Sequence, residues 1–294
     1  MQSPLICVPC LNHCVFTKLC LDSILATVPP TAAEILVVDD GSTDDTNRLL
    51  ASYGGRIRVY RNSIPLGAFA SVNVGLRLAG KRPSVIVAND HVLVQGWLKA
   101  LTKAAGTRVG VYSPMVPDMP ISPLTVEIAG RRNPLREHFF KGREETDQDI
   151  QEFLRRLYPE GLTSFSQKVT KEAQSLGILP GCWAGCQIIP SEVVEVIGYF
   201  DERFGHHGWA DIDFMGRAQA ADFPIGMVPF YVHHFGSITL RKAMGDLDQQ
   251  SYAGRLTSAG ESFFHQKQGL LRERVSEYEM EGRLCRIDLK STIS

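Results

Sequence analysis

The chain has 294 residues, 44% hydrophobic and 21% charged, which is typical of a globular protein of one large domain or two closely packed ones. A net charge of -1 without a long basic run gives no electrostatic support for binding nucleic acid or an anionic membrane surface. No apolar run reaches the roughly 18 to 20 residues that cross a bilayer, and the first residues lack the features of a signal peptide, so we expect a cytoplasmic protein.

The first hundred residues alternate between strand and helix patterns. Four apolar or alternating runs predict strands, at 4–9, 34–39, 56–61 and 84–90. Three segments between them have helical patterns, at 13–27, 42–54 and 67–79. The middle one begins with hydroxyl residues, which predicts a hydroxyl N-cap. This order predicts an α/β fold with a doubly wound, mostly parallel sheet.

The pattern changes after residue 107. Residues 110–135 contain five prolines and no clear period, so we expect irregular structure there. Thr146 and Asp149 have the spacing of a capping box, which predicts an amphipathic helix over 145–157. The rest of the chain predicts further elements: a polar helix at 164–176, short strands and turns over 179–240 with one helix near 211–221, and a helical tail over 246–294.

Two of the predicted strands end in acidic residues. The strand at 34–39 ends at Asp39 and Asp40, and the strand at 84–90 ends at Asn89 and Asp90. Ligands of open parallel sheets bind outside the carboxyl ends of the strands, so we expect both ends to face one crevice. The sequence lacks the glycine-rich phosphate-binding motifs G-x-G-x-x-G after its first strand and G-x-x-x-x-G-K-[ST] anywhere. A divalent cation held by Asp90 is the alternative way to bind a diphosphate.

The motifs of this chain resemble those of a known family. VPCLN, VVDDGSTDDT, NSIPLGAFASVNVGLRLA and VIVANDHVLVQGWL are similar to the nucleotide-sugar-binding motifs of the family 2 glycosyltransferases, which have the GT-A fold. The block from GCWAGC to QAADF resembles the acceptor side of that family, and HHFGSIT and FFHQKQG resemble its closing motifs. The resemblance covers about residues 3–104 and 178–270, and 105–177 match no motif that we recognise.

The resemblance implies an inverting transferase that moves a sugar from a nucleotide diphosphate, with UDP expected, to a hydroxyl of a glycan or glycoconjugate. Mn²⁺ or Mg²⁺ is the implied cofactor, and an oligomer is compatible with the sequence. The implied division of the chain is a nucleotide-sugar-binding half at 1–104, an inserted lid or acceptor segment at 105–177, an acceptor and catalytic half at 178–245, and the helical tail at 246–294.

The resemblance also implies residues that bind the donor. Asp39 matches the aspartate that accepts hydrogen bonds from the base or ribose, and a turn aspartate that caps the next helix is its alternative. Pro9 and Leu11 match positions that line the base pocket, although core packing would explain them as well. Gly67 and Asn89 fall in the donor motifs. We expect one of three neighbours of Asp39 to cap the next helix in its place: Asp40, Ser42 or Thr43.

Metal binding is implied for Asp90, the last acid of a D-x-D motif whose first position is Ala88 in this chain. His234 matches a histidine that some members use as a further ligand. Its neighbour His233 would point to the opposite face of a strand, so only one of the two can reach the metal.

The general base is implied at Asp211, in the family's E-D motif, where Ala210 replaces the usual glutamate. Asp213 lies on another face of the same predicted helix and is the less suitable base. Trp209 matches an acceptor platform, with core packing as its alternative, and Gly185 belongs to the acceptor block. Because both Ala88 and Ala210 depart from the family pattern, a non-catalytic sugar or nucleotide-sugar binding protein remains the second hypothesis.

Overall fold

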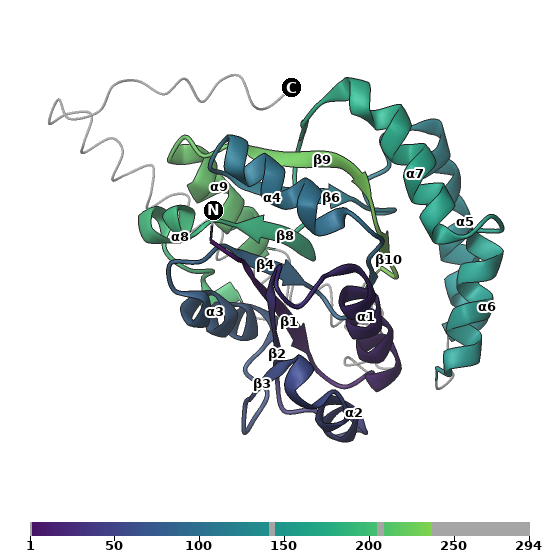
Figure 1. Ribbon diagram of the computed structural model, residues 1–294, viewed down its shortest axis with the longest axis horizontal. Coiled ribbons are helices and arrows are strands. Elements are labelled where there is room, and N and C mark those ends of the chain that lie inside the picture. Colours follow the sequence, from purple (N-terminus) through teal and green to yellow (C-terminus); the bar gives the residue numbers. More distant parts are fainter. Residues whose placement is uncertain (1, 141–144, 205–208, 237–294) are drawn as a thin grey trace, which may run out of the picture.

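The computed structural model describes residues 2–140, 145–204 and 209–236 (Figure 1). An eight-stranded sheet has the order β3-β2-β1-β4-β8-β6-β9-β7. Its strands are β1 (Leu5–Cys10), β2 (Glu34–Asp39), β3 (Arg58–Arg61), β4 (Ser84–Val87), β6 (Val111–Met115), β7 (Leu179–Pro180), β8 (Cys186–Ile189) and β9 (Ile225–Tyr231). Strands β3, β2, β1 and β4 are parallel, and β8 runs antiparallel to both β4 and β6. The predicted α/β fold with a mostly parallel sheet is confirmed.

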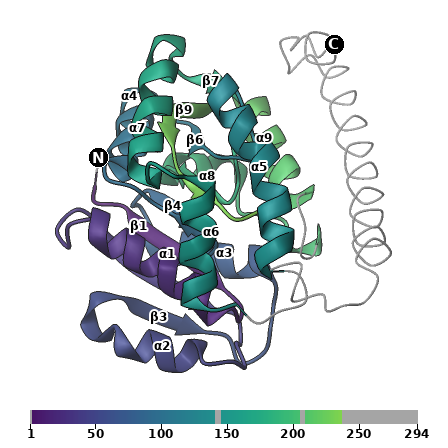
Figure 2. The same ribbon diagram turned by 90° about the vertical axis from the view of Figure 1, so that its right-hand side faces the viewer.

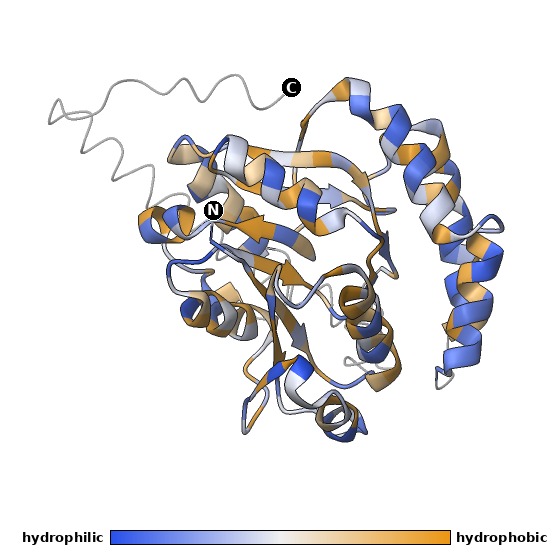
Figure 3. Cartoon of the chain, viewed as in Figure 1, coloured by the Kyte–Doolittle hydropathy of each residue, from blue (hydrophilic) through white to orange (hydrophobic). Residues whose placement is uncertain are grey.

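Helices cover both faces of this sheet. Successive side chains of a strand point to opposite faces, so Ile6 and Val8 of β1 pack toward α1 (Cys14–Thr27) and α4 (Trp97–Thr107). Leu5 and Cys7 face the other layer, which consists of α3 (Ala68–Ala79), α8 (Ser191–Ile197) and α9 (Trp209–Ala220). Helix α2 (Thr46–Ser52) lies beside α1. Hydrophobic residues accordingly dominate the strands in Figure 3.

A further helical layer lies at one side of the sheet and contains α5 (Pro123–Phe140), α6 (Asp147–Leu157) and α7 (Leu162–Ala173) (Figure 2). Its aromatic side chains form a third core with Phe16 of α1 and Phe235. Residues 105–177 therefore contribute both this layer and β6, which lies within the main sheet. None of the helices in the described part of the chain has the length and apolar character needed to span a membrane.

A second, two-stranded sheet pairs β5 (His91–Val92) with β10 (His233–His234) in antiparallel orientation. His234 lies opposite His91 in this register. Because β5 follows β4 within a few residues, the small sheet brings residues from distant parts of the sequence to the carboxyl end of β4.

Two expectations about local structure were wrong. The segment 110–135 is largely ordered, as β6 and most of α5. Pro123 is tolerated at the first position of α5, where a helix needs no N–H donor, and Ser122 and Thr125 bond each other's backbone N–H groups there. Helix α2 begins later than expected, and its N-cap, Asp45, makes no side-chain capping bond.

Several other helix predictions are confirmed. The capping box of Thr146 and Asp149 is present at the start of α6. The helices expected at 13–27, 164–176 and 211–221 correspond to α1, α7 and α9. The expected tail helix at 246–294 lies outside the described residues.

Candidate functional site

The acids at the end of β2 are held by donors from the protein. Asp39 is fully buried, and its carboxylate accepts hydrogen bonds from the Ser42 N–H (2.9 Å) and from the guanidinium of Arg61. Asp40 accepts from the Asn62 amide (2.7 Å) and from the backbone N–H groups of Leu66 (2.9 Å) and Gly67 (2.8 Å). Asp40 thus holds the loop that enters α3, and the expectation that it caps α2 was wrong.

The turn after β1 is tied to the loop after β2. Asn12 and His13 both have a φ of 57°, a left-handed conformation that asparagine tolerates better than most residues. The Asn12 side chain accepts from the Thr43 N–H at 2.7 Å, and the Asn12 N–H donates to the Ser42 hydroxyl at 2.7 Å. The expected capping of α2 by Ser42 or Thr43 was therefore also wrong, because these residues bond Asn12 instead.

The other residues predicted to bind the donor lie around these turns. Pro9 is partly exposed in β1, and Leu11 follows the strand and is also partly exposed. Gly67 is the N-cap of α3 with a φ of 101°, a conformation that favours glycine. Asn89 is buried, and its amide donates to the Thr17 hydroxyl at 2.8 Å. Asn89 is thus engaged with α1, whereas Pro9 and Leu11 present surface at the carboxyl end of the sheet.

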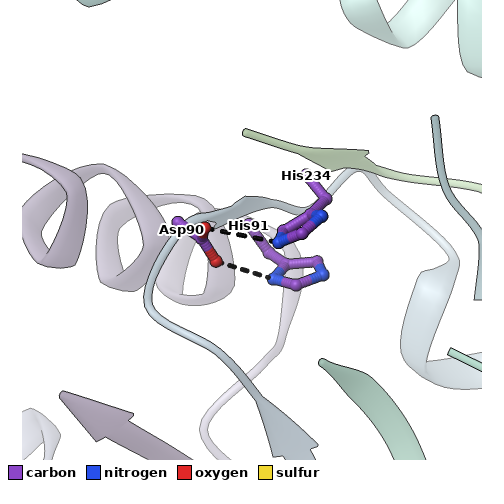
Figure 4. A group of neighbouring side chains, drawn as sticks. All are labelled: Asp90, His91 and His234. Carbon is purple, nitrogen blue, oxygen red and sulfur yellow. Dashed lines mark ion pairs between the residues drawn. The ribbon is translucent and has the colours of Figure 1, made fainter. Parts of the chain in front are cut away.

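At the end of β4, three side chains form a compact cluster: Asp90, His91 and His234 (Figure 4). The Asp90 carboxylate lies 3.3 Å from Nε2 of His234 and 3.6 Å from Nδ1 of His91, and the two imidazole rings stack with centroids 4.5 Å apart. All three residues are buried. We did not predict His91 from the sequence, although its position directly after Asp90 in the metal motif was an available signal.

These residues fit a divalent cation. Buried Nε2 of His91 has no hydrogen-bond partner among the described residues, and leaving such an atom unsatisfied costs about 1 to 3 kcal/mol. Buried Oδ2 of Asp90 also accepts no hydrogen bond from the described residues and faces Nε2 of His234 at 3.3 Å as an ion pair. One ligand atom from each of the three residues lies within 4.8 Å of the others. A carboxylate with imidazoles suits a first-row transition ion better than Mg²⁺, which prefers oxygen ligands.

The electrostatics of the cluster also favour a cation. Burial alone would raise the pKa of Asp90, but His234 and His91 beside it lower that pKa well below its usual value. Burial would lower the pKa of His234, but Asp90 and Asp118 raise it to about 9. Burial and the neighbouring His234 lower the pKa of His91, which keeps that imidazole in the neutral form that binds metals. The cluster therefore stabilises positive charge next to Asp90.

His233 lies on the other side of β10, as strand alternation requires. Its Nδ1 is 2.8 Å from the Tyr158 hydroxyl, and its ring packs on Phe235 in the third core. Of the two adjacent histidines, only His234 lies beside Asp90.

The loop between β7 and β8 connects this cluster to α9. The Trp183 ring lies 5.0 Å from that of His234. A Cβ on Gly185 would come within 2.9 Å of the His91 ring and 2.6 Å of the Trp183 indole nitrogen, so a larger residue there would displace one of them. Burial and, to a smaller extent, the nearby Asp211 raise the pKa of Cys182 to about 12. Gly185, predicted for the acceptor side, thus lies against the histidine cluster.

Asp211 lies in the first turn of α9 and is partly exposed, and burial raises its pKa to about 7. Asp213 differs, because it is buried and its carboxylate is 2.8 Å from the Arg217 guanidinium. Trp209 is partly buried and packs against the core beneath α9, and Ala210 is fully buried there. An aspartate with a pKa near neutrality can accept a proton at physiological pH, as a general base must.

The sheet and the helices on both of its faces are those of a GT-A glycosyltransferase fold. The sequence model of Glycosyl transferase family 2 matches residues 5–172, more than half of the chain, so this chain belongs to that family. The match includes most of 105–177, where we recognised no motif. A search of curated proteins gave no significant match.

Solved structures of glycosyltransferases have the same fold. A mannosyltransferase from Pyrobaculum calidifontis, in complex with GDP-Man and Mn²⁺, is 17% identical over 90% of this chain and 70% of its own, with a TM-score of 0.52. S. aureus TarS is 16% identical, with a TM-score of 0.51, over 83% of this chain and 63% of its own. GalNAc-T7 with UDP, GalNAc and Mn²⁺ is 14% identical over 79% of this chain, which spans only 43% of that structure, with a TM-score of 0.51.

Proposed function

We propose that this protein is an inverting glycosyltransferase that moves a sugar from a nucleotide diphosphate, with UDP as the expected nucleotide, to a hydroxyl of a glycan or glycoconjugate. The observation that carries the proposal is the buried cluster of Asp90, His91 and His234 at the carboxyl end of β4, in a chain of this family. Two proteins of similar fold, solved with Mn²⁺ and GDP-Man or with Mn²⁺, UDP and GalNAc, support a nucleotide-sugar donor.

Different residues of the chain would bind the metal ion and the nucleotide. Asp90, His91 and His234 would hold a divalent ion, which when bound neutralises the charge of the donor diphosphate. Asp39 would accept from the base or ribose, since a carboxylate has about four lone-pair sites and the described part of the chain donates two hydrogen bonds to Asp39. Pro9 would line the base pocket from its partly exposed position on β1.

Asp211 would act as the general base. Its carboxylate would take the proton of the acceptor hydroxyl while that oxygen bonds to the anomeric carbon of the sugar. The bond from that carbon to the diphosphate oxygen breaks on the opposite face, and its electron pair goes to the nucleotide. Because attack and departure occur on opposite faces of the carbon, its configuration inverts. The pairing of Asp213 with Arg217 supports Asp211 over Asp213, because a paired, buried carboxylate is a poorer proton acceptor.

One observation favours a second function, a non-catalytic nucleotide-sugar binding protein. Ala88 and the buried Ala210 stand where the family usually has acids. Both hypotheses predict donor binding, but only the first predicts turnover.

The test is a screen of nucleotide sugars with Mn²⁺, measuring release of the nucleotide diphosphate by transfer or hydrolysis and thermal stabilisation in parallel. The transferase proposal expects release that is lost on adding chelator. Stabilisation without release, across donors and a panel of glycan acceptors, would support the binding protein. Absence of any nucleotide-sugar binding would contradict both.

A further inference from the structure

Asp118 contacts the far side of the His234 ring. It lies in the turn after β6, and its Oδ2 is 2.6 Å from Nδ1 of His234. The Nε2 atom of the same ring lies 3.3 Å from Asp90. The imidazole is therefore held between two carboxylates, with Nδ1 toward Asp118 and Nε2 toward the candidate metal cluster.

Arg132 of α5 holds Asp118 in place. Its guanidinium bonds both carboxylate oxygens of Asp118, at 2.7 and 2.9 Å, and its Nη1 also donates to the backbone carbonyl of His234 at 3.2 Å. Its side chain is only 7% exposed, so the pair is shielded from competing water. A bidentate pair of this kind restricts the carboxylate to one orientation.

A second arginine, one turn along the same helix, supports this arrangement. Arg136 donates to the backbone carbonyls of Phe235 and Gly236, at 3.2 and 2.8 Å. A Cβ on Gly236 would collide with the Arg136 guanidinium and lie 3.4 Å from that of Arg132. Gly236 has a φ of 89°, which favours glycine. Helix α5 thus fixes both the side chain of His234 and the backbone that follows it.

We propose that Asp118 and Arg132 are positioning residues for metal binding, which hold His234 with Nδ1 protonated and Nε2 available to the cation. Metal-ligating histidines generally donate the other ring N–H to a carboxylate or carbonyl, and loss of that partner typically lowers metal affinity about 10- to 100-fold. The inference rests on the metal site of the proposed function. It adds that residues in the segment without a recognised motif control the affinity of that site.

A purely structural role makes a different prediction. If the ion pair only attached α5 to the end of β10, breaking it would lower thermal stability but leave the affinity of the folded protein for metal unchanged. Metal affinity of the folded protein is therefore the informative measurement.

The experiment titrates Mn²⁺ by EPR into the full chain and into three variants. Asp118→Asn keeps the size of the side chain but removes its charge, and we expect its Kd for Mn²⁺ to rise about 10- to 100-fold. Arg132→Met should raise the Kd by a smaller factor, because Asp118 remains but is no longer held. Arg131→Met is the matched control: Arg131 is the neighbour on α5 but is partly exposed and pairs with Glu127, so its Kd should stay within about twofold of the parent.

Circular dichroism verifies that the Asp118→Asn protein is folded. A Kd for Mn²⁺ equal to that of the parent in this folded variant would overturn the proposal. If the parent itself bound no Mn²⁺, the metal site of the proposed function would be refuted. This outcome is distinguishable from refutation of the positioning role, in which the parent and the variant bind Mn²⁺ equally.

A measurement on the parent protein decides the question even if the variants do not fold. NMR of the imidazole nitrogens with diamagnetic Cd²⁺ should show His234 protonated at Nδ1 and bound to the metal through Nε2. Coordination through Nδ1, or a proton on Nε2, would overturn the proposal.

Discussion

At the end of β2, Asp39 and Asp40 accept hydrogen bonds from backbone N–H groups, an amide and a guanidinium. At the end of β4, the two oxygens of Asp90 instead face two imidazoles, His91 at 3.6 Å and His234 at 3.3 Å. Both ends carry buried acids on parallel strands of one sheet. The difference is in the surrounding donors. A carboxylate such as Asp40, whose two oxygens accept from a neighbouring loop, organises that loop. A carboxylate such as Asp90, whose oxygens face imidazole nitrogens, is suited to bind an ion.

The largest effect is expected from removing the Asp90 carboxylate. In Asp90→Ala we expect Mn²⁺-dependent UDP binding and transfer to be abolished, because His91 and His234 alone provide no negative charge for the ion. Isothermal titration of UDP with and without Mn²⁺ measures the effect, and circular dichroism checks the fold. UDP affinity in Mn²⁺ equal to that of the parent would refute the metal assignment.

A further acid, Asp211 of α9, tests whether the protein contains a general base as well as an ion site. In Asp211→Asn we expect transfer to fall about two to four orders of magnitude, the loss typical of a positioned general base, with donor affinity unchanged. Asp213→Asn is the matched control on the same helix, and it should cost far less transfer because Asp213 is paired with Arg217. The reverse order of the two effects would identify Asp213 as the base.

The pH dependence of transfer gives a smaller, graded effect. Burial raises the pKa of Asp211 to about 7, so below that pH the protonated, inactive form predominates. At saturating Mn²⁺, kcat/KM should fall about tenfold per pH unit below about 7 and level off above it. A profile of kcat/KM from about pH 5 to 9 measures this. A flat profile with chemistry rate-limiting would show that the base has an ordinary aspartate pKa or is another residue.

Much of the fold and part of the site follow from the sequence. The alternation of buried runs with helical patterns predicts the parallel half of the sheet, because periodicity is a local signal. The acids at 39, 40 and 90 were found because carboxyl strand ends are where ligands bind. The sequence indicated Asp90 and His234 of the cluster but not His91, although His91 directly follows Asp90. That His91 faces His234 depends on the pairing of β5 with β10, more than 140 residues away along the chain.

The role of α5 could not be predicted, for a physical reason. Its prolines, at 123 and 134, suppress the helix signal, and its two buried arginines, Arg132 and Arg136, are typical in isolation of a solvated helix face. Their burial depends on the carbonyls of residues 234–236 and on Asp118, which only the tertiary structure brings together. The likewise unexpected role of Asp40 depends on a loop some 25 residues away.

The smallest effect is expected at Asp40, where a change in protein stability can be separated from a change in metal binding. In Asp40→Asn one oxygen becomes an NH₂ group that faces N–H donors, so at least one hydrogen bond to the loop before α3 is lost. A buried donor left unsatisfied costs about 1 to 3 kcal/mol of unfolding free energy, measurable by urea denaturation. The affinity for Mn²⁺ should remain within about twofold of the parent, because the Asp90 cluster is built by β4, β5 and β10 rather than by this loop. A drop in Mn²⁺ affinity as large as that of Asp90→Ala would mean that both strand ends form one ion site, and the distinction between an acid that organises a loop and one that binds an ion would not hold.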